Sequence, residues 1–305
     1  MKLHEDKSVF YQVLEDTAKY MEFVDTGIVE KDYFVTYFLK KIIEKQPNVI
    51  FKGGTSLSKC YKIIKRFSED IDLNIDTKAA KLTEGQRKRL KQDIVSIIEE
   101  SGFSLENAGQ IRSRRDFNRY MIDYHSKDSN VYLNQYLIVE TAVYIKSFPT
   151  QTMEAASLVY DFLMAKSGEK AIEEYDLKPF NVRVQSLERT FIDKVFAIAD
   201  YYLNGHIKNH SRHLYDIYKL YPKIIFNNEF AELVREVREV REPHSTCLSA
   251  QVGIDVPKLL QRILTEKVYE SDYNQITGTL LFENVPYAEA IKVIQEISHS
   301  GYFEY

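Results

Sequence analysis

The chain has 305 residues, of which 44% are hydrophobic and 28% are charged, and it contains 11 glycines and 7 prolines. These values are typical of a globular protein and exclude a disordered, low-complexity or fibrous chain. Lysine and arginine number 41 against 45 aspartates and glutamates. The formal net charge of -4 excludes a whole-chain attraction to nucleic acid or membrane, so only local patches can bind them.

The cysteines and the first residues bear on the compartment. Cys60 and Cys247 lie far apart and form neither a metal knuckle nor a disulfide framework. Residues 1–7 are polar where a signal peptide needs an apolar stretch. No segment approaches the roughly 20 apolar residues that a membrane span needs. We therefore expect a cytoplasmic protein with no membrane partner.

Helical and strand-like patterns alternate over the first 150 residues. Apolar residues recur at spacings of three and four in the helical segments, and they alternate or form short runs in the strand-like ones. Thr83 to Gln86 has the pattern of a capping box, and Pro47 ends an earlier helix. The predicted helices lie in 9–18, 30–46, 57–67 and 84–98, and the predicted strands in 48–51, 70–76, 118–124 and 136–145.

The second half of the chain is predicted to be helical. The strand signal fades after about Pro149, and helical stripes follow in 186–202, 212–220, 230–240 and 287–297. The predicted fold class is α+β, an α/β-type core with a mixed sheet plus a C-terminal helical domain. We place the first domain at 1–150 and the second at 151–305.

The segment from Phe51 to Leu73 contains the candidate ligand-binding motifs. It reads as a strand, a Gly53-Gly54-Thr55-Ser56 turn, a helix, and a strand with Asp70 and Asp72. Residues i and i+2 of a strand share a face, so the two carboxylates point together and repel each other. A divalent cation offsets that repulsion, and Mg²⁺ prefers oxygen ligands. Gly-Gly lets backbone approach a ligand, and a helix start offers N–H groups to phosphate, so the order suits a triphosphate with its metal.

Each half of this pattern has an ordinary explanation when it stands alone. An Asp-x-Asp usually marks a solvated strand end, and a Gly-Gly is usually a turn. The two together, in this order and with a helix-length spacer, favour the functional interpretation.

These motifs resemble the nucleotidyltransferase superfamily related to DNA polymerase β. More narrowly, the segments Phe51–Lys59 and Arg66–Leu73 resemble the AbiEii/AbiGii family, the toxin half of bacterial abortive-infection toxin–antitoxin pairs. Glu30–Tyr33 is similar to the family segment before the first motif, and Glu188–Lys194 and Ser211–Tyr218 are similar to its two later motifs. The resemblance spans roughly residues 28–220.

The resemblance implies a role for each matching position. Thr55 and Ser56, with the backbone of Gly53 and Gly54, would bind the β- and γ-phosphates of the nucleotide. Asp70 and Asp72 would hold Mg²⁺, or Mn²⁺ in its place, at the α-phosphate of an NTP substrate.

A third acidic residue is usual in the superfamily and can deprotonate the attacking hydroxyl. Glu140, which is surrounded by apolar residues in 137–143, is our candidate for this catalytic and metal-binding role. A buried carboxylate is costly unless it is paired or metal-bound. Asp123 on the preceding strand is the rival, and an ordinary strand-edge glutamate is the alternative to both.

Three later residues are candidate nucleotide contacts. Lys194 lies partly on the apolar stripe of its helix, so it needs an anionic partner or must extend to solvent. Arg212 and Asp216 are spaced i,i+4, which alone is a routine surface pair. The resemblance implies a triphosphate contact for Lys194, and for Asp216 a contact with the nucleotide or with Lys194. The second domain would then complete the nucleotide cleft.

A basic cluster of Arg112, Arg114, Arg115 and Arg119 lies near the predicted strand 118–124, and Tyr120 and Tyr124 follow it. It could contact the phosphates of an RNA acceptor, although a solvated charged loop is the more frequent explanation.

The combined interpretation is a Mg-dependent nucleotidyltransferase that moves an NMP from an NTP to an acceptor hydroxyl. The resemblance implies a toxin with a cognate antitoxin and a tRNA acceptor. Two alternatives stay open. One is a small-molecule nucleotidyltransferase with an acceptor such as an aminoglycoside. The other is a nucleotide-binding partner protein without turnover.

Overall fold

The computed structural model describes residues 1–75, 82–113, 115–126, 135–143 and 146–304. The chain divides into two compact units. Unit 1 comprises Met1–Tyr61, Ser68–Lys146 and Thr150–Val184, and unit 2 comprises Lys62–Phe67, Ser147–Pro149 and Gln185–Tyr305.

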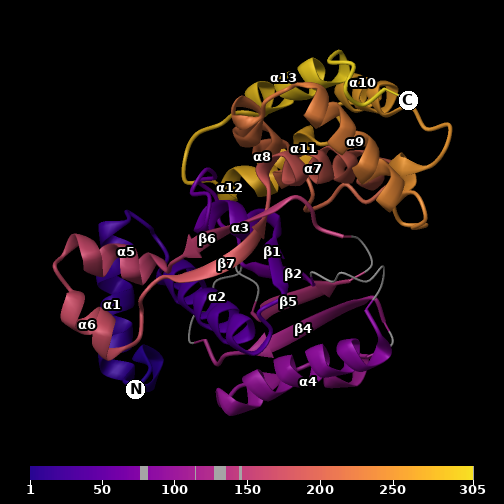
Figure 1. Cartoon of the computed structure of the whole chain (residues 1–305). Helices are drawn as coiled ribbons and strands as arrows, with labels where there is room; N and C mark the ends of the chain where they lie inside the picture. The colour runs from indigo at the N-terminus through magenta and orange to yellow at the C-terminus, as the bar shows by residue number, and fades with distance from the viewer. Residues whose placement is uncertain (76–81, 114, 127–134, 144–145, 305) are drawn as a thin grey trace. The chain divides into compact units, whose positions relative to one another are not determined.

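A seven-stranded mixed sheet forms the centre of unit 1 (Figure 1). The strands are β1 (Val49–Lys52), β2 (Asp70–Ile75), β3 (Ser104–Leu105), β4 (Phe117–Asp123), β5 (Leu137–Ala142), β6 (Thr150–Ala155) and β7 (Phe180–Gln185), in the order β3-β4-β5-β2-β1-β7-β6. Strand β2 pairs antiparallel with β1 and parallel with β5, so it lies inside the sheet.

Six α-helices accompany the described strands of unit 1 (Figure 1). They are α1 (Lys7–Tyr20), α2 (Thr26–Lys45), α3 (Gly53–Lys59), α4 (Glu84–Glu100), α5 (Leu158–Ala165) and α6 (Glu169–Glu174). Helices α2 and α4 pack on each other, and α2 also packs on β2 and β5. Alternation along the strands sends Ile71, Leu73 and Val139 into this core and leaves Asp70, Asp72 and Glu140 on the other face.

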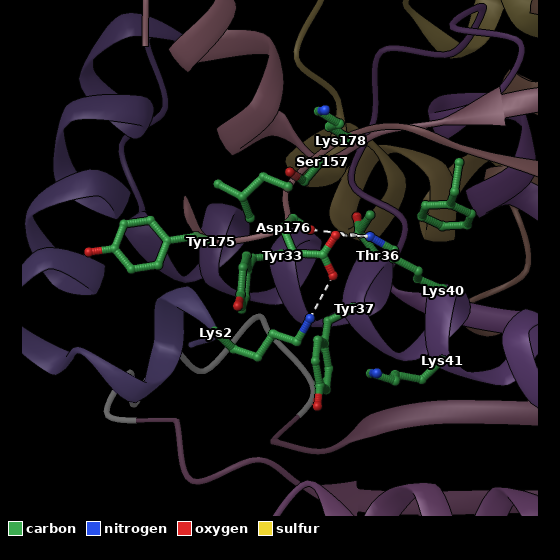
Figure 2. Close-up of a pocket in the computed structure, with 12 residues that line it drawn as sticks. Lys2, Tyr33, Thr36, Tyr37, Lys40, Lys41, Ser157, Tyr175, Asp176 and Lys178 are labelled. Carbon is green, nitrogen blue, oxygen red and sulfur yellow. Dashed lines mark hydrogen bonds and ion pairs between the residues drawn. The ribbon is translucent and has the colours of Figure 1, made fainter. Parts of the chain in front are cut away.

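The N-terminal segment of unit 1 is tied to the segment between α6 and β7 by charge (Figure 2). Lys2 Nζ and Lys40 Nζ lie 2.6 and 2.7 Å from the carboxylate of Asp176. The cavity beside this ion-pair cluster has a volume of only about 30 Å³. It has room for little more than water, so it is not a candidate ligand site.

Unit 2 is helical in its described residues (Figure 1). Its helices are α7 (Leu187–Leu203), α8 (Arg212–Leu220), α9 (Asn228–Arg241), α10 (Val256–Glu266), α11 (Glu270–Asp272), α12 (Gly278–Leu280) and α13 (Tyr287–Ser298).

Both units also contain short 3₁₀ or π turns, which are η1 to η5 at Leu3–Glu5, Ala108–Gln110, Tyr221–Lys223, Leu248–Ala250 and Tyr273–Thr277. Across the described ranges, none of the helices is both long and apolar enough to span a bilayer.

The predicted fold class is confirmed, as are the four helical stripes after residue 186 and the Thr83–Gln86 capping box. Two local predictions were wrong. The helix predicted over 57–67 ends at Lys59, and Lys62 has a φ of +54°, which a helix does not adopt. Strands β6 and β7 lie beyond Pro149, where none was predicted, and both join the sheet. Unit 1 accordingly continues to Val184, past the predicted boundary at 150.

Candidate functional site

The Gly-Gly turn and the Asp-x-Asp strand meet in unit 1. Lys52 at the end of β1 pairs with Asp72 of β2, so Gly53 follows directly beside that carboxylate. A Cβ atom added to Gly53 would lie 2.0 Å from Asp72 Oδ2, and the φ of Gly53 is +78°. Both the backbone conformation and the close approach therefore require glycine here. The segment from Phe51 to Leu73 brings backbone and carboxylate together as its sequence predicted.

Gly53→Ala is expected to lower nucleotidyl transfer by about 100-fold, because a shift of about 1 Å in a catalytic group has an effect of that size. The new methyl group must displace the Asp72 carboxylate. Gly102→Ala is the matched control. Gly102 has a similar φ of +75°, but its Cβ would meet no atom within 4 Å. Steady-state rates and unfolding midpoints of both variants check this. Equal losses of activity in the two variants would contradict a specific role for the Gly53–Asp72 contact.

The hydroxyl groups of Thr55 and Ser56 are engaged inside unit 1. Ser56 Oγ donates to the Gly53 carbonyl oxygen at 2.8 Å, and Thr55 Oγ1 lies 2.9 Å from Ser68 Oγ. Both side chains are buried, whereas Gly53 and Gly54 are half-buried. In this state the two hydroxyls hold the turn in shape. Their predicted contact with phosphates stays a prediction and requires them to exchange these partners.

A row of four charged residues crosses the sheet, which we call the charged row: Lys52, Asp72, Glu140 and Arg119. The strand register pairs Asp72 with Lys52 on one side and with Glu140 on the other. Glu140 is paired in turn with Arg119, whose Nε lies 3.5 Å from Glu140 Oε1. Two carboxylates thus stand at the centre of the row with one cation at each end. Asp70 lies on the same strand face, next to the row.

Glu140 is the carboxylate that the sheet brings next to Asp72. Burial, together with the negative charges of Asp72 and Asp70, raises the pKa of Glu140 to about 7. Asp123, the rival candidate, lies near the end of β4. It accepts a hydrogen bond from the His125 backbone at 2.8 Å. The geometry therefore favours Glu140 over Asp123 as the third acidic residue.

Glu140→Gln is expected to stabilise the metal-free protein. A carboxyl whose pKa is raised by folding loses stability as pH rises from about 4.5 to about 7, because the folded state holds its proton more tightly. The variant should exceed the wild type by roughly 2–3 kcal/mol above pH 7 and by nothing below pH 4.5. Urea unfolding in EDTA across this pH range measures the difference. Glu154→Gln, an exposed glutamate of β6, is the control, and a pH-independent difference would contradict the prediction.

Asp70, Asp72 and Glu140 are the carboxylates available to a divalent cation. Within the described ranges, no three His, Cys, Asp or Glu side chains converge as a complete metal cage. Mg²⁺ is usually bound by one or two carboxylates with substrate phosphates and water. The mutual repulsion of Asp70, Asp72 and Glu140 matches that donor set, since a cation would offset it. The residues present thus fit a cation that arrives with a nucleotide.

Helix α2 anchors this part of the sheet through two adjacent charged residues, the buried Lys31 and the half-buried Asp32. Lys31, fully buried, lies 2.9 Å from Glu69 Oε2, directly before Asp70, and donates to the Tyr136 carbonyl at 2.7 Å. The next residue, Asp32, binds Lys59 Nζ at 2.6 Å and accepts from the Leu158 backbone N–H at 2.7 Å. The Glu30–Tyr33 segment therefore fixes the end of α3 and the start of β2.

Asp216 of unit 2 is the centre of a buried ion cluster with Arg66 and Lys194. Arg66 binds both carboxylate oxygens, Nε to Oδ1 at 2.7 Å and Nη2 to Oδ2 at 2.8 Å. Lys194 Nζ donates to Oδ2 at 2.6 Å. All three side chains are less than 10% exposed, and the two cations hold the pKa of Asp216 well below its usual range. Sequence reasoning gave Arg66 no role, although it stands inside the quoted motif.

Arg212 begins α8, one turn before Asp216. Burial lowers the pKa of Lys194 and His213, and the positive charge of Arg212 adds to both shifts. Unit 2 thus gathers Arg66, Lys194 and Arg212 around one buried carboxylate, a cationic environment of the kind that accepts phosphate. The predicted nucleotide contacts of Lys194, Arg212 and Asp216 stay predictions.

The basic cluster near β4 does not form one patch. Arg112 and Arg115 line a shallow hollow with Lys88 and Lys91 of α4, whereas Arg119 belongs to the charged row. Arg114 lies outside the described residues. Tyr120 and Tyr124, the two tyrosines near these cations, are 1% and 5% exposed and belong to the core of unit 1.

Comparison with known proteins agrees with this arrangement. A family model described as "Nucleotidyl transferase AbiEii toxin, Type IV TA system" matches residues 38–293. Among solved structures, the chain is similar to the MenT4 nucleotidyltransferase toxin of Mycobacterium tuberculosis H37Rv, with a TM-score of 0.60 and 15% identity, covering 93% of this chain and 87% of that one. No curated protein sequence matches significantly. Since the family match covers most of the chain, the protein belongs to the AbiEii family of nucleotidyltransferase toxins.

Proposed function

We propose that the protein transfers a nucleoside monophosphate from an NTP to an acceptor hydroxyl in a Mg²⁺-dependent reaction. The observation that carries the proposal is the contact of Gly53 with the Asp72 carboxylate, next to Glu140 in the charged row. Glycine backbone that approaches a carboxylate this closely gives phosphates and their cation a common place to bind. The AbiEii match supports the same reaction class.

The residues of unit 1 have separate roles in that reaction. The backbone of Gly53 and Gly54 binds the β- and γ-phosphates, and Asp70 and Asp72 orient the α-phosphate. Glu140, with a pKa of about 7, takes the proton of the acceptor hydroxyl. The acceptor oxygen forms a bond to the α-phosphorus as the bond to the pyrophosphate oxygen breaks, and pyrophosphate leaves. Bound Mg²⁺ would supply charge neutralisation at the reacting phosphate.

The proposed acceptor is the 3′ end of tRNA, and the proposed setting is growth inhibition that a cognate antitoxin restrains. The family description names a type IV toxin–antitoxin system, which implies such a partner. The acceptor is inferred from the motif resemblance, and Arg119 beside Glu140 offers a cation for its phosphates. Both NTP and tRNA are abundant in the cytoplasm, where we place the reaction.

Transfer of label from each α-³²P NTP onto total bacterial RNA tests the proposal. We expect a labelled, tRNA-sized product in Mg²⁺ that EDTA removes. A parallel reaction offers a mixture of aminoglycosides as acceptors and separates them by chromatography. Label on an aminoglycoside alone would move the acceptor to the small-molecule class. No label in any reaction, with NTP binding intact, would refute transfer and leave a nucleotide-binding partner protein.

A further inference from the structure

The solvent face of β4 carries an aromatic residue beside the charged row. Phe117 and Arg119 are two residues apart, so their side chains share one face of the sheet. The register pairs Arg119 with Glu140, and it pairs Phe117 with Ala142, two residues further along β5. The phenyl ring therefore lies one step along the strands from the proposed general base.

Phe117 is not needed for the core of unit 1. Its side chain is 43% exposed, whereas Tyr120 and Ile122, on the opposite face of β4, are 1% and 0% exposed and fill the core. The residue paired with Phe117 is Ala142, whose single methyl group covers little of a ring. Single exposed apolar residues are common. This one lies on the same sheet face as the catalytic carboxylates, which makes its position informative.

Arg119 supplies a cation at the same place. Its side chain is 50% exposed, and its Nε lies 3.5 Å from Glu140 Oε1. A guanidinium has five N–H donors in a planar fork, so a contact through Nε leaves capacity for a phosphate. The Arg119 guanidinium would therefore attract a phosphodiester of an RNA acceptor.

We propose that Phe117 and Arg119 form the acceptor subsite. The terminal base of a single-stranded RNA stacks on Phe117, and a backbone phosphate of that RNA binds Arg119. The acceptor hydroxyl then lies between Arg119 and the reacting phosphate, within reach of Glu140. Stacking on an aromatic side chain with a nearby cation is how single-stranded nucleic acid is bound without sequence preference. This inference rests on the proposed function and adds the acceptor class and its contacts.

Kinetics with Phe117→Leu and Phe117→Tyr test the stacking contact. Leucine retains the apolar surface and removes the ring, and tyrosine retains the ring. We expect Phe117→Leu to raise the KM for RNA by roughly 5- to 100-fold. The KM for NTP should stay unchanged, and Phe117→Tyr should resemble the wild type. Tyr20→Leu is the matched control, since Tyr20 of α1 is 46% exposed and lies outside the site.

A second readout does not depend on turnover. A short single-stranded RNA with 2-aminopurine as its 3′-terminal base loses fluorescence when that base stacks on protein. The wild type, Phe117→Tyr and Tyr20→Leu should quench it, and Phe117→Leu should not. Arg119→Gln should weaken RNA binding and reduce the slope of log K against log salt by about 0.7 for one lost phosphate contact. Arg119→Lys should retain most of that slope.

Equal KM for RNA and equal quenching in Phe117→Leu and the wild type would overturn the inference. So would an unchanged salt slope in Arg119→Gln. If the wild type transfers no label, the proposed function fails, and the quenching assay still decides whether the ring binds RNA.

Discussion

The Asp70→Asn/Asp72→Asn double variant is expected to lose nucleotidyl transfer by roughly three orders of magnitude or more, because transfer depends on fixed charge at the reacting phosphate. Asparagine retains the size of aspartate and removes the negative charge. The neighbouring Glu140 then loses the two charges that raise its pKa. We therefore expect the variant to be at least as stable as the wild type while its cation affinity falls. Single-turnover rates at saturating NTP measure the effect.

Asp123→Asn is the control for this double variant, because Asp123 lies on the same sheet face near the end of β4, bonded to the His125 backbone. It should retain activity to within a few-fold. Isothermal titration of Mg²⁺ in the presence of a non-hydrolysable NTP separates cation loss from nucleotide loss. Near-wild-type turnover of the double variant would refute the proposed role of the two carboxylates.

Asp216→Asn is expected to lower the free energy of unfolding by about 3–5 kcal/mol, the usual effect of removing one partner from a buried ion pair. Asp216 is fully buried and accepts from Arg66 and Lys194, so the variant leaves two buried cations without their counter-charge. Asp255→Asn is the matched control. Asp255 caps α10 with its carboxylate and is partly exposed, and asparagine caps a helix about as well as aspartate. Denaturant unfolding compares the two variants.

The sign of the pH dependence distinguishes this cluster from Glu140. The folded pKa of Asp216 is depressed, so its contribution is fully present above the unfolded value of about 4 and is lost as pH falls below it. The difference between the wild type and Asp216→Asn should therefore be constant from pH 5 to 7 and shrink in stronger acid. A difference that persists undiminished to pH 2 would contradict an ionised Asp216 in the folded state.

The cluster also offers a test of the predicted nucleotide contacts. Lys194→Met removes one of the two cations that bind Asp216 and leaves the bidentate Arg66 pair. Comparison of NTP affinity with unfolding free energy in this variant separates a role in binding nucleotide from a role in holding unit 2 together. Unchanged NTP affinity with reduced stability would make Lys194 purely structural.

Local sequence patterns were sufficient for most of the elements. The helices after residue 186 and the strand 70–75 follow from side-chain periodicity, which depends only on neighbours along the chain. The Gly53–Ser56 turn and Asp70/Asp72 could be combined because a short segment joins them, and the close packing of Gly53 on Asp72 agrees with that prediction. The AbiEii family match agrees with the same motifs.

Prediction from apolar spacing was wrong where contacts between distant segments determine the backbone conformation. The apolar spacing from Leu57 to Phe67 predicted a longer helix, but Arg66 bonds Asp216, 150 positions away, and the chain leaves α3 at Lys59 to reach it. Strand β6 has weak alternation, so its sequence carries little local signal. Strand β7 does alternate apolar and polar residues, but it is short and was not recognised; its pairing of Val184 with Phe51 of β1 places it in the sheet.

A candidate site for a triphosphate and its cation could be inferred from local sequence, because the Gly-Gly turn and the paired aspartates are close in the chain, and the resemblance of these motifs to the AbiEii/AbiGii family implied the reaction class. The residues that surround these motifs could be identified only in the folded chain. The register of β1, β2, β5 and β4 aligns Lys52, Asp72, Glu140 and Arg119. A shift of one residue in any of these strands would turn that strand's charged side chain to the opposite face and remove it from the row. Register depends on contacts between distant segments, so the charged row and Phe117 beside it could be recognised only in the folded chain.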